Sequence, residues 1–330
     1  MIAQLNKAYL FAKPSKVVPR LLSYFFYEGR PATTRGQWFN PITFRVLKNA
    51  SHSNQIPECE SPVFITGTGR SGSTILGLVL SMHPDVGFLN EPKALWFVAN
   101  PKDDLIGSYS NGDALYFMNA NDATPAISSN VKSIYSSYLQ ISSSKRIVDK
   151  FPEMIFRIEY LNTIFNNPKY LFLFRNPWST IASTAIWSNQ HTNVAKHEDW
   201  WGVNNRKWNL LLEQVVTHDP HLSKYKKEIE KFVSQTDKAA VEWIATMNQG
   251  LKMMELFPEK IMPVKYEDLA GDPEKNLKAI CDFIQLSPSS EFIDFSKKNI
   301  HPTEPHNQIA IHPLLSAPIA DLCLKLGYKF

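Results

Sequence analysis

The stretch GTGRSGST at residues 67–74 combines three glycines, one arginine and four hydroxyl residues within eight positions. Glycines let a backbone curl around a ligand, and the free N–H groups at the start of a following helix attract anions. Arginine adds a planar fork of hydrogen-bond donors. The stretch therefore predicts a phosphate-binding loop, whose contacts we expect from Gly69, Arg70, Ser71, Gly72, Ser73 and Thr74.

This loop departs from the form that binds nucleoside triphosphates. That form has a lysine directly after the second glycine of G-x-x-x-x-G, and Ser73 stands at this place. A triphosphatase also needs an acidic residue at the end of a buried strand to hold magnesium. The best candidate strand, YLFLF at 170–174, is followed by Arg175 instead. We expect the loop to bind an anion without a lysine or a metal ion.

Arg175 and Ser183 predict a second anion site. The carboxyl ends of parallel strands form the edge at which open α/β sheets bind ligands, and Arg175 follows such a strand. Ser183 comes eight residues later, about two turns into the next predicted helix. One ligand with phosphates at both of its ends would occupy this site and the loop together.

The elements that must position these residues alternate between strands and helices. Short apolar runs predict strands and periodic apolar patterns predict helices. The expected strands lie at 62–66, 147–148, 170–174 and 261–265, and the expected helices at 73–82, 153–165, 179–187, from a cap at Thr236 or Asp237 to Leu256, and 273–284. This alternation predicts an α/β fold with a P-loop-like central parallel sheet flanked by helices.

The chain divides into a basic extension, residues 1–55, and one α/β domain, residues 56–330. The first 50 residues contain eight basic residues and a single acid, Glu28, and we expect this extension to pack on the domain. Residues 101–145 and about 187–225 are predicted to be irregular insertions, rich in serine or aromatic residues. Insertions of this kind often form lids or acceptor walls.

Composition excludes several classes of protein. The 35 basic and 31 acidic residues give a formal net charge of +4, without the basic stripe of a nucleic-acid binder. Three dispersed cysteines, Cys59, Cys281 and Cys323, exclude a disulfide scaffold and fit a reducing compartment. No apolar run reaches membrane-spanning length, and no metal-ligand pattern is evident. We expect a cytoplasmic location and no bound metal.

In order and spacing, these motifs resemble those of the sulfotransferases that use 3′-phosphoadenosine 5′-phosphosulfate (PAPS). The loop at 67–74 is similar to the 5′-phosphosulfate loop of the tyrosylprotein and many bacterial enzymes, with Ser73 in place of a threonine. Arg175 and Ser183 match the 3′-phosphate pair of the family. In VKYEDLAGDPEKNLKAICDFIQL, Tyr266 matches a tyrosine that contacts the donor nucleotide. The resemblance covers about residues 60–290.

The resemblance also implies the catalytic residues. HPDVGFLNEP is similar to the segment that carries the catalytic acid, which makes Glu91 the expected general base. Lys150 aligns with a lysine of the same subgroup, and with Arg70 it would stabilise charge on the departing phosphate. Trp187 stands where the tyrosylprotein enzymes carry a further arginine.

Other assignments stay open at this stage. His83, His191 and His197 are rival bases, and Lys297 or Lys298 is a candidate for a last donor contact. A P-loop small-molecule kinase with ATP and magnesium, and a non-catalytic nucleotide-binding module, are the competing functions. The expected partner is a small-molecule, carbohydrate or natural-product acceptor, or a peptide tyrosine, and not nucleic acid. A homo-oligomer is compatible with the sequence.

Overall fold

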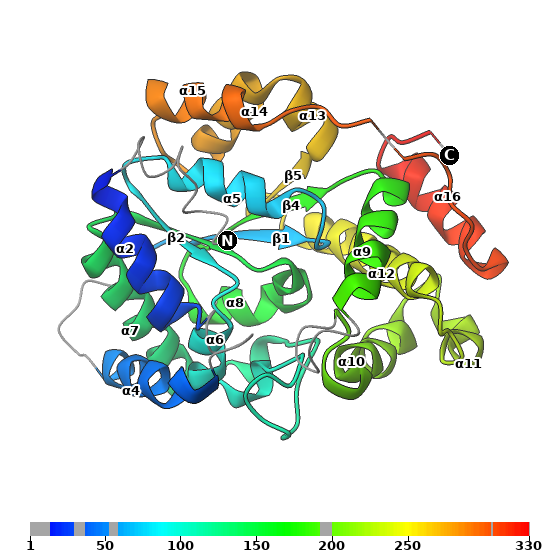
Figure 1. The fold of residues 1–330 in the computed structure, drawn as a ribbon, viewed down its shortest axis with the longest axis horizontal. Helices are drawn as coiled ribbons and strands as arrows, with labels where there is room; N and C mark the ends of the chain where they lie inside the picture. The colour runs from blue at the N-terminus through cyan, green and yellow to red at the C-terminus, as the bar shows by residue number, and fades with distance from the viewer. Residues whose placement is uncertain (1–13, 30–36, 53–58, 192–199, 305, 330) are drawn as a thin grey trace.

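The computed structural model describes residues 14–29, 37–52, 59–191, 200–304 and 306–329. In this part of the chain a five-stranded sheet has the strand order β2-β3-β1-β4-β5, and every neighbouring pair is parallel (Figure 1). The strands are β1 (Val63–Gly67), β2 (Val86–Asn90), β3 (Arg146–Lys150), β4 (Lys169–Phe174) and β5 (Ile261–Lys265). The predicted fold, a central parallel sheet flanked by helices, is confirmed.

Helices cover both faces of this sheet (Figure 1). The helices of the described residues are α2 (Val17–Leu22), α4 (Asn40–Ser51), α5 (Ser73–Ser81), α6 (Lys93–Ala99), α7 (Pro125–Ser142), α8 (Ile158–Ile164), α9 (Pro177–His191), α10 (Arg206–Gln214), α11 (Lys226–Ile229), α12 (Gln235–Leu256), α13 (Tyr266–Gly271), α14 (Pro273–Phe283), α15 (Ser290–Asn299) and α16 (Ser316–Lys325).

Alternate residues of the strands enter two separate cores. On β1, Phe64 packs in the core beneath α7, α8 and α12, whereas Val63 and Ile65 pack in the core beneath α5, α13, α14 and α15. All five residues of β1 are buried. A strand buried on both faces needs a nearly continuous apolar run, which is why VFIT was recognisable in the sequence.

The strand register brings the carboxyl ends of the strands together. Asn90 at the end of β2 pairs with Lys150 at the end of β3, and Ile65 of β1 pairs with Lys150 from the other side. Gly67 pairs with Leu173 of β4. The segments that follow β1, β2, β3 and β4 therefore start along one edge of the sheet.

Several elements of the structure were not expected from the sequence, among them β2, α7 and α10, which lies in the stretch 187–225 that was expected to be irregular. Strand β2 was not expected, because VGFLN is short and contains a glycine and an asparagine, which are both rare in strands. The stretch 101–145, expected to be irregular, contains the 18-residue helix α7. Thr124 caps this helix through the N–H of Ile127, and six of the ten serines of the stretch lie within the helix.

Two expected helices start differently. The segment 153–165 begins as a 3-10 helix, Pro152–Arg157, and only then becomes α8. Its break lies at Arg157, a fully buried side chain that is held 2.6 Å from Asp103. Helix α12 is capped by the hydroxyl of Ser234 and not by Thr236 or Asp237.

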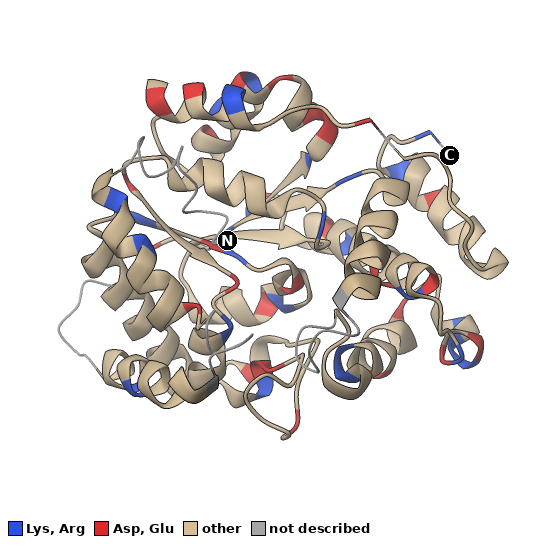
Figure 2. Ribbon diagram, in the orientation of Figure 1, with Lys and Arg blue, Asp and Glu red and all other residues tan. Residues whose placement is uncertain are grey.

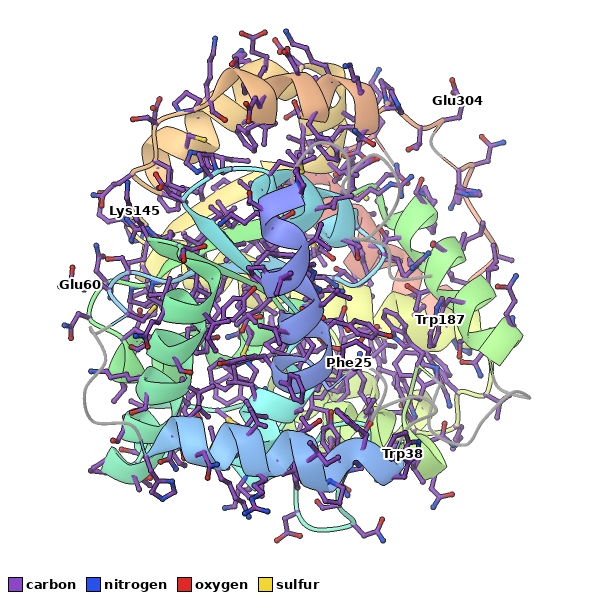
Figure 3. The ribbon with its side chains drawn as sticks, turned by 60° about the vertical axis from the view of Figure 1, so that its left-hand side comes forward. Phe25, Trp38, Glu60, Lys145, Trp187 and Glu304 are labelled. Carbon is purple, nitrogen blue, oxygen red and sulfur yellow. The ribbon has the colours of Figure 1, made fainter. Side chains whose placement is uncertain are left out.

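In the described part of the basic extension, residues 16–28 lie against the open side of β2, and the later helix packs on α6 and α7. The extension forms α2, a π-helical turn, Ser23–Tyr27, and α4; Figure 3 brings this side forward, with Phe25 and Trp38 labelled. Basic and acidic residues are interspersed along the outer helices, as Figure 2 shows. Among the described residues, no helix has both the length and the apolar character needed to cross a membrane.

Candidate active site

The loop between β1 and α5 adopts a conformation that requires glycine at two places. Gly67 has φ 131°, and a Cβ there would lie 2.0 Å from the carbonyl oxygen of Leu173. Gly72 has φ 95°, and a Cβ there would lie 2.4 Å from the Tyr266 ring. The glycines therefore let the loop curl between β4 and α13 before α5 begins.

Hydroxyl groups in this loop are buried without hydrogen-bond partners among the described residues. Ser71 is fully buried and Thr68 is 3% exposed, and neither hydroxyl has a partner there. Ser73 and Thr74 begin α5, whose first N–H groups are not used within the helix. Because buried polar groups are normally paired, these groups are suited to receive an anionic ligand.

Two arginines meet beside the loop. The Arg70 Nε donates to the Ser183 hydroxyl at 3.1 Å, which joins the loop to α9. Arg175 follows β4, donates from Nη2 to the Thr303 hydroxyl at 2.7 Å, and lies over the Tyr266 ring at 4.8 Å. Burial lowers the pKa of the Arg70 guanidinium, and the positive charge of Arg175 lowers it further. Two neighbouring positive charges favour an anion between or beside them.

The carboxylate expected to act as a base lies at the ends of β2 and β3. Glu91 directly follows β2, and its N–H donates to the Lys150 carbonyl at 2.7 Å. The Lys150 ammonium forms an ion pair with the Glu91 carboxylate, whose second oxygen is 3.8 Å from Lys93. Lys150 is 3% exposed and Glu91 is 23% exposed, so the carboxylate keeps a solvent-accessible side.

Glu91 is also within electrostatic reach of the anion loop. Its negative charge raises the pKa of Arg70, partly offsetting the effect of burial. The structure thus brings the anion loop, Arg175, Ser183, Tyr266, Glu91 and Lys150 to one edge of the sheet.

A buried charged cluster beside the loop was not anticipated. Trp200 packs on the loop, since a Cβ on Gly69 would lie 2.3 Å from its ring. The Trp200 indole N–H donates to Glu242 at 2.7 Å, and Lys207 lies over its ring at 4.7 Å. Lys207 is 2.7 Å from both Glu153 and Glu242. Burial alone would lower the pKa of Lys207, but the two carboxylates raise it well above its usual value.

These charges were missed because each stands alone in the sequence. Lys207, Glu153 and Glu242 come from three separate helical segments, and no spacing connects them. The only sequence signal was the group of tryptophans at 187–208, of which Trp187 packs edge-on against Trp200 at 5.6 Å. Figure 3 labels Trp187 on α9.

The remaining candidates lie elsewhere or outside the described residues. The buried His83 ring has its Nε2 2.8 Å from the Ser287 carbonyl oxygen, which ties α5 to the segment before α15. Lys297 is exposed and pairs with Glu274 of α14 at 2.6 Å, and Lys298 is exposed. His197 and the side chain of His191 fall outside the described residues. The described part of the chain contains no group of three or more metal-ligating side chains.

A parallel sheet with an anion loop after its central strand places the chain in the P-loop-like class of α/β proteins. A model of the sulfotransferase family matches residues 62–290. This segment is more than half of the chain, so the chain belongs to the sulfotransferase family.

Several solved structures are similar in fold to this chain, among them the following two. The sulfotransferase domain of the olefin synthase of Synechococcus PCC 7002 has a TM-score of 0.52 and 18% identity, over 84% of this chain and 98% of that domain. The sulfotransferase domain from the curacin biosynthetic pathway has a TM-score of 0.51 and 19% identity, over 83% of this chain and 100% of that domain.

A curated relative is similar to part of the sequence. Nodulation protein NoeE of Sinorhizobium fredii is 26% identical over 125 residues. These residues cover 36% of this chain and 30% of the nodulation protein, so the chain spans less than a third of that relative.

Proposed function

We propose that this protein transfers the sulfuryl group of PAPS to a hydroxyl or amine of an organic acceptor, with Glu91 as general base. One observation carries the proposal. The partly exposed carboxylate of Glu91 lies at the same sheet edge as the anion-binding loop, close enough to Arg70 of that loop to raise its pKa. Sulfuryl transfer requires both a proton acceptor and a set of fixed positive charges.

The donor-binding assignment follows from two groups of residues. The loop N–H groups with Ser71, Ser73 and Thr74 would hold the 5′-phosphosulfate, and Arg175 with Ser183 would hold the 3′-phosphate. The unpaired buried hydroxyls and the neighbouring arginines fit a ligand that carries two anionic groups. Tyr266, which touches Gly72 and lies under Arg175, is placed between these groups and would contact the nucleotide.

The reaction needs one proton transfer and one displacement at sulfur. The acceptor oxygen forms a bond to sulfur while the bond from sulfur to the bridging phosphate oxygen breaks. Glu91 takes the proton of the acceptor hydroxyl, and Arg70 and Lys150 stabilise the charge on the departing phosphate. Because Lys150 is paired with Glu91 in this structure, the base must exchange that contact for the acceptor proton.

The acceptor class is a medium-sized organic alcohol, phenol, amine or sugar. Trp200 packs on the loop at Gly69, and Trp187 packs on Trp200, so aromatic surface lies next to the proposed reaction centre. Aromatic rings favour the flat or apolar faces of such molecules.

Calorimetric titration with 3′-phosphoadenosine 5′-phosphate, the product of the donor, tests the proposal. We expect binding that does not depend on metal ions and that is weakened in Arg175→Ala, followed by transfer from labelled PAPS in an acceptor screen. ATP with magnesium is the control. A preference for ATP with magnesium would overturn the proposal in favour of a kinase, and tight bisphosphate binding with no transfer to any acceptor would favour a binding module.

A further inference from the structure

We infer that Arg20 and Glu28, in the basic extension, are positioning residues for Glu91, and this role rests on the proposed function of Glu91 as the base. Both residues precede residue 62, where the family match begins, so the device belongs to the part of the chain outside that match. It acts through the backbone of β2, the strand that ends immediately before Glu91.

Strand β2 lies at the edge of the sheet, where every second residue turns its backbone N–H and C=O away from β3. Side chains of the extension bind these outward groups. Arg20 donates to the Phe88 carbonyl at 2.9 Å, and the Asn90 N–H donates to the Glu28 carboxylate at 2.7 Å. At the other end of the strand, Lys16 donates to the Val86 carbonyl at 3.3 Å.

Arg20 and Glu28 form a buried ion pair. Glu28 is fully buried and Arg20 is 2% exposed. Their two contacts, at 2.6 and 2.9 Å, use both carboxylate oxygens, and the Ser23 hydroxyl donates to Glu28 at 3.0 Å. A doubly bonded pair of this kind has a fixed geometry, so the oxygen that receives the Asn90 N–H is held in place.

The position that this pair supports is strained. Glu91 has φ 49°, in the left-handed region that side chains other than glycine and asparagine rarely adopt. Such a conformation persists only where its surroundings determine it. The preceding N–H, of Asn90, is held by Glu28, and the N–H of Glu91 is held by the Lys150 carbonyl. Glu28 therefore supplies one of the restraints that fix the peptide units on either side of the Asn90 Cα and aim the carboxylate of the base.

The test compares two double variants that differ in one hydrogen-bond acceptor. Replacing both members of a buried ion pair avoids leaving one charge unpaired. Arg20→Met with Glu28→Gln keeps an oxygen for the Asn90 N–H, whereas Arg20→Met with Glu28→Leu removes it. We expect kcat to fall about 10-fold in the leucine variant relative to the glutamine variant, because misplaced catalytic groups lose at least this much. The affinities of the two variants for 3′-phosphoadenosine 5′-phosphate should agree within about twofold, since the base acts in turnover and not in binding of the nucleotide.

Lys16→Met is the matched control, because Lys16 binds the same edge of the same strand four residues before Asn90. It should leave kcat and donor binding unchanged. If the leucine variant does not fold, Glu28→Asp takes its place. It keeps the charge but withdraws the carboxylate from the Asn90 N–H, and we expect about a threefold loss of kcat. If the glutamine and leucine variants have equal kcat, the positioning role is overturned. A kcat equal to that of the wild-type protein in Glu28→Asp would overturn it as well.

Amide hydrogen exchange separates this inference from the proposed function. In the leucine variant, exchange at Asn90 and Glu91 should be about 10-fold faster than in the glutamine variant, whether or not sulfuryl transfer occurs. Unchanged protection would overturn the positioning role alone. Absence of transfer by the wild-type protein from labelled PAPS, with protection lost as expected, would overturn the proposed function and leave the restraint on β2 established.

Discussion

The carboxyl edge of the sheet has two halves whose charged groups have different neighbours. Beside β1 and β4, the hydroxyls of Thr68 and Ser71 are buried without partners among the described residues, and Arg70 lies close enough to Arg175 for its pKa to be lowered. Beside β2 and β3, Glu91 is paired with Lys150, and its backbone is held by hydrogen bonds.

This difference indicates which half depends on a ligand. Unpaired buried hydroxyls and neighbouring like charges cost free energy until an anion binds them. In the half with Glu91, the carboxylate is neutralised by a lysine of the protein itself. Donor binding should therefore stabilise the first half, whereas chemistry in the second half requires an existing contact to be exchanged.

The largest expected effect comes from the half with the base. In Glu91→Gln, loss of the proton acceptor should reduce turnover by about 10²- to 10⁴-fold. Binding of 3′-phosphoadenosine 5′-phosphate should stay within about threefold, because the proposed donor-binding residues lie in the other half. Steady-state kinetics and calorimetry measure the two effects. Glu213→Gln, an exposed acid on α10, is the control. Near-normal turnover in Glu91→Gln would transfer the role to His191 or His197.

Strand β3 carries a second titrating group in the same half. Burial raises the pKa of the Asp149 carboxyl from 3.8 to about 7, against hydrogen bonds from Tyr135 and Trp96 that lower it. The unfolded chain releases this proton at lower pH than the folded protein does, so folding stability falls as the pH rises from about 4 to about 7. The loss should be on the order of a few kcal/mol.

Asp149→Asn should remove this part of the pH dependence, because an amide oxygen still accepts the Tyr135 hydroxyl and does not titrate. Urea unfolding at pH 5 and pH 8 gives the measurement. Asp103, whose pKa burial raises to about 6, remains in both proteins, so the difference between their slopes isolates Asp149. Identical slopes for both proteins would contradict the assignment.

In the donor half, Arg175→Ala should weaken binding of 3′-phosphoadenosine 5′-phosphate about 10- to 100-fold, as expected for one charge-assisted hydrogen bond. Binding of adenosine 5′-phosphosulfate, which lacks the 3′-phosphate, should change little. Calorimetry with both ligands makes the comparison. Lys145→Ala, at the start of β3 and 79% exposed, serves as the control on the opposite edge of the sheet. Equal losses for both ligands would show that Arg175 does not recognise the 3′-phosphate.

The smallest expected effect comes from comparing two serine hydroxyls, one expected to bind the ligand and one that stabilises the fold. Ser71→Ala should weaken donor binding about threefold to 10-fold and leave the free energy of unfolding unchanged or raised by up to about 1 kcal/mol. Ser81→Ala, at the other end of α5, removes a hydroxyl that donates to the Leu78 carbonyl at 2.6 Å. That variant should lose stability and keep donor binding. The same result for both serines would show that the Ser71 hydroxyl does not serve the ligand.

Much of the donor half could be predicted from the sequence because its signals are local. The loop and the start of α5 are contiguous in the sequence. Arg175 and Ser183 lie eight residues apart, the first directly after β4 and the second within α9. Parallel strands buried on both faces gave continuous apolar runs at β1 and β4. Only the partners of these residues, such as the contact between Arg70 and Ser183, required the folded structure.

The other half depends on contacts between distant segments. Glu91 and Lys150 were both expected at the site, but nothing in their spacing showed that they would pair with each other. Strand β2 was missed because an edge strand of five residues with Gly87 has a weak local signal. Glu28 stood out only as the single acid of a basic segment, and its burial against β2 was not readable from composition.

The strand order has a consequence for when the binding loop takes shape. Strand β1 lies in the middle of the sheet, and Val63 pairs with Val148 on one side and with Lys169 on the other. Pairing between such distant segments is slow, because the chain must close long loops before their contacts stabilise it. A nascent chain that ends before β4 lacks one wall of the loop, so the ability to hold the donor should emerge late in folding, together with the sheet itself.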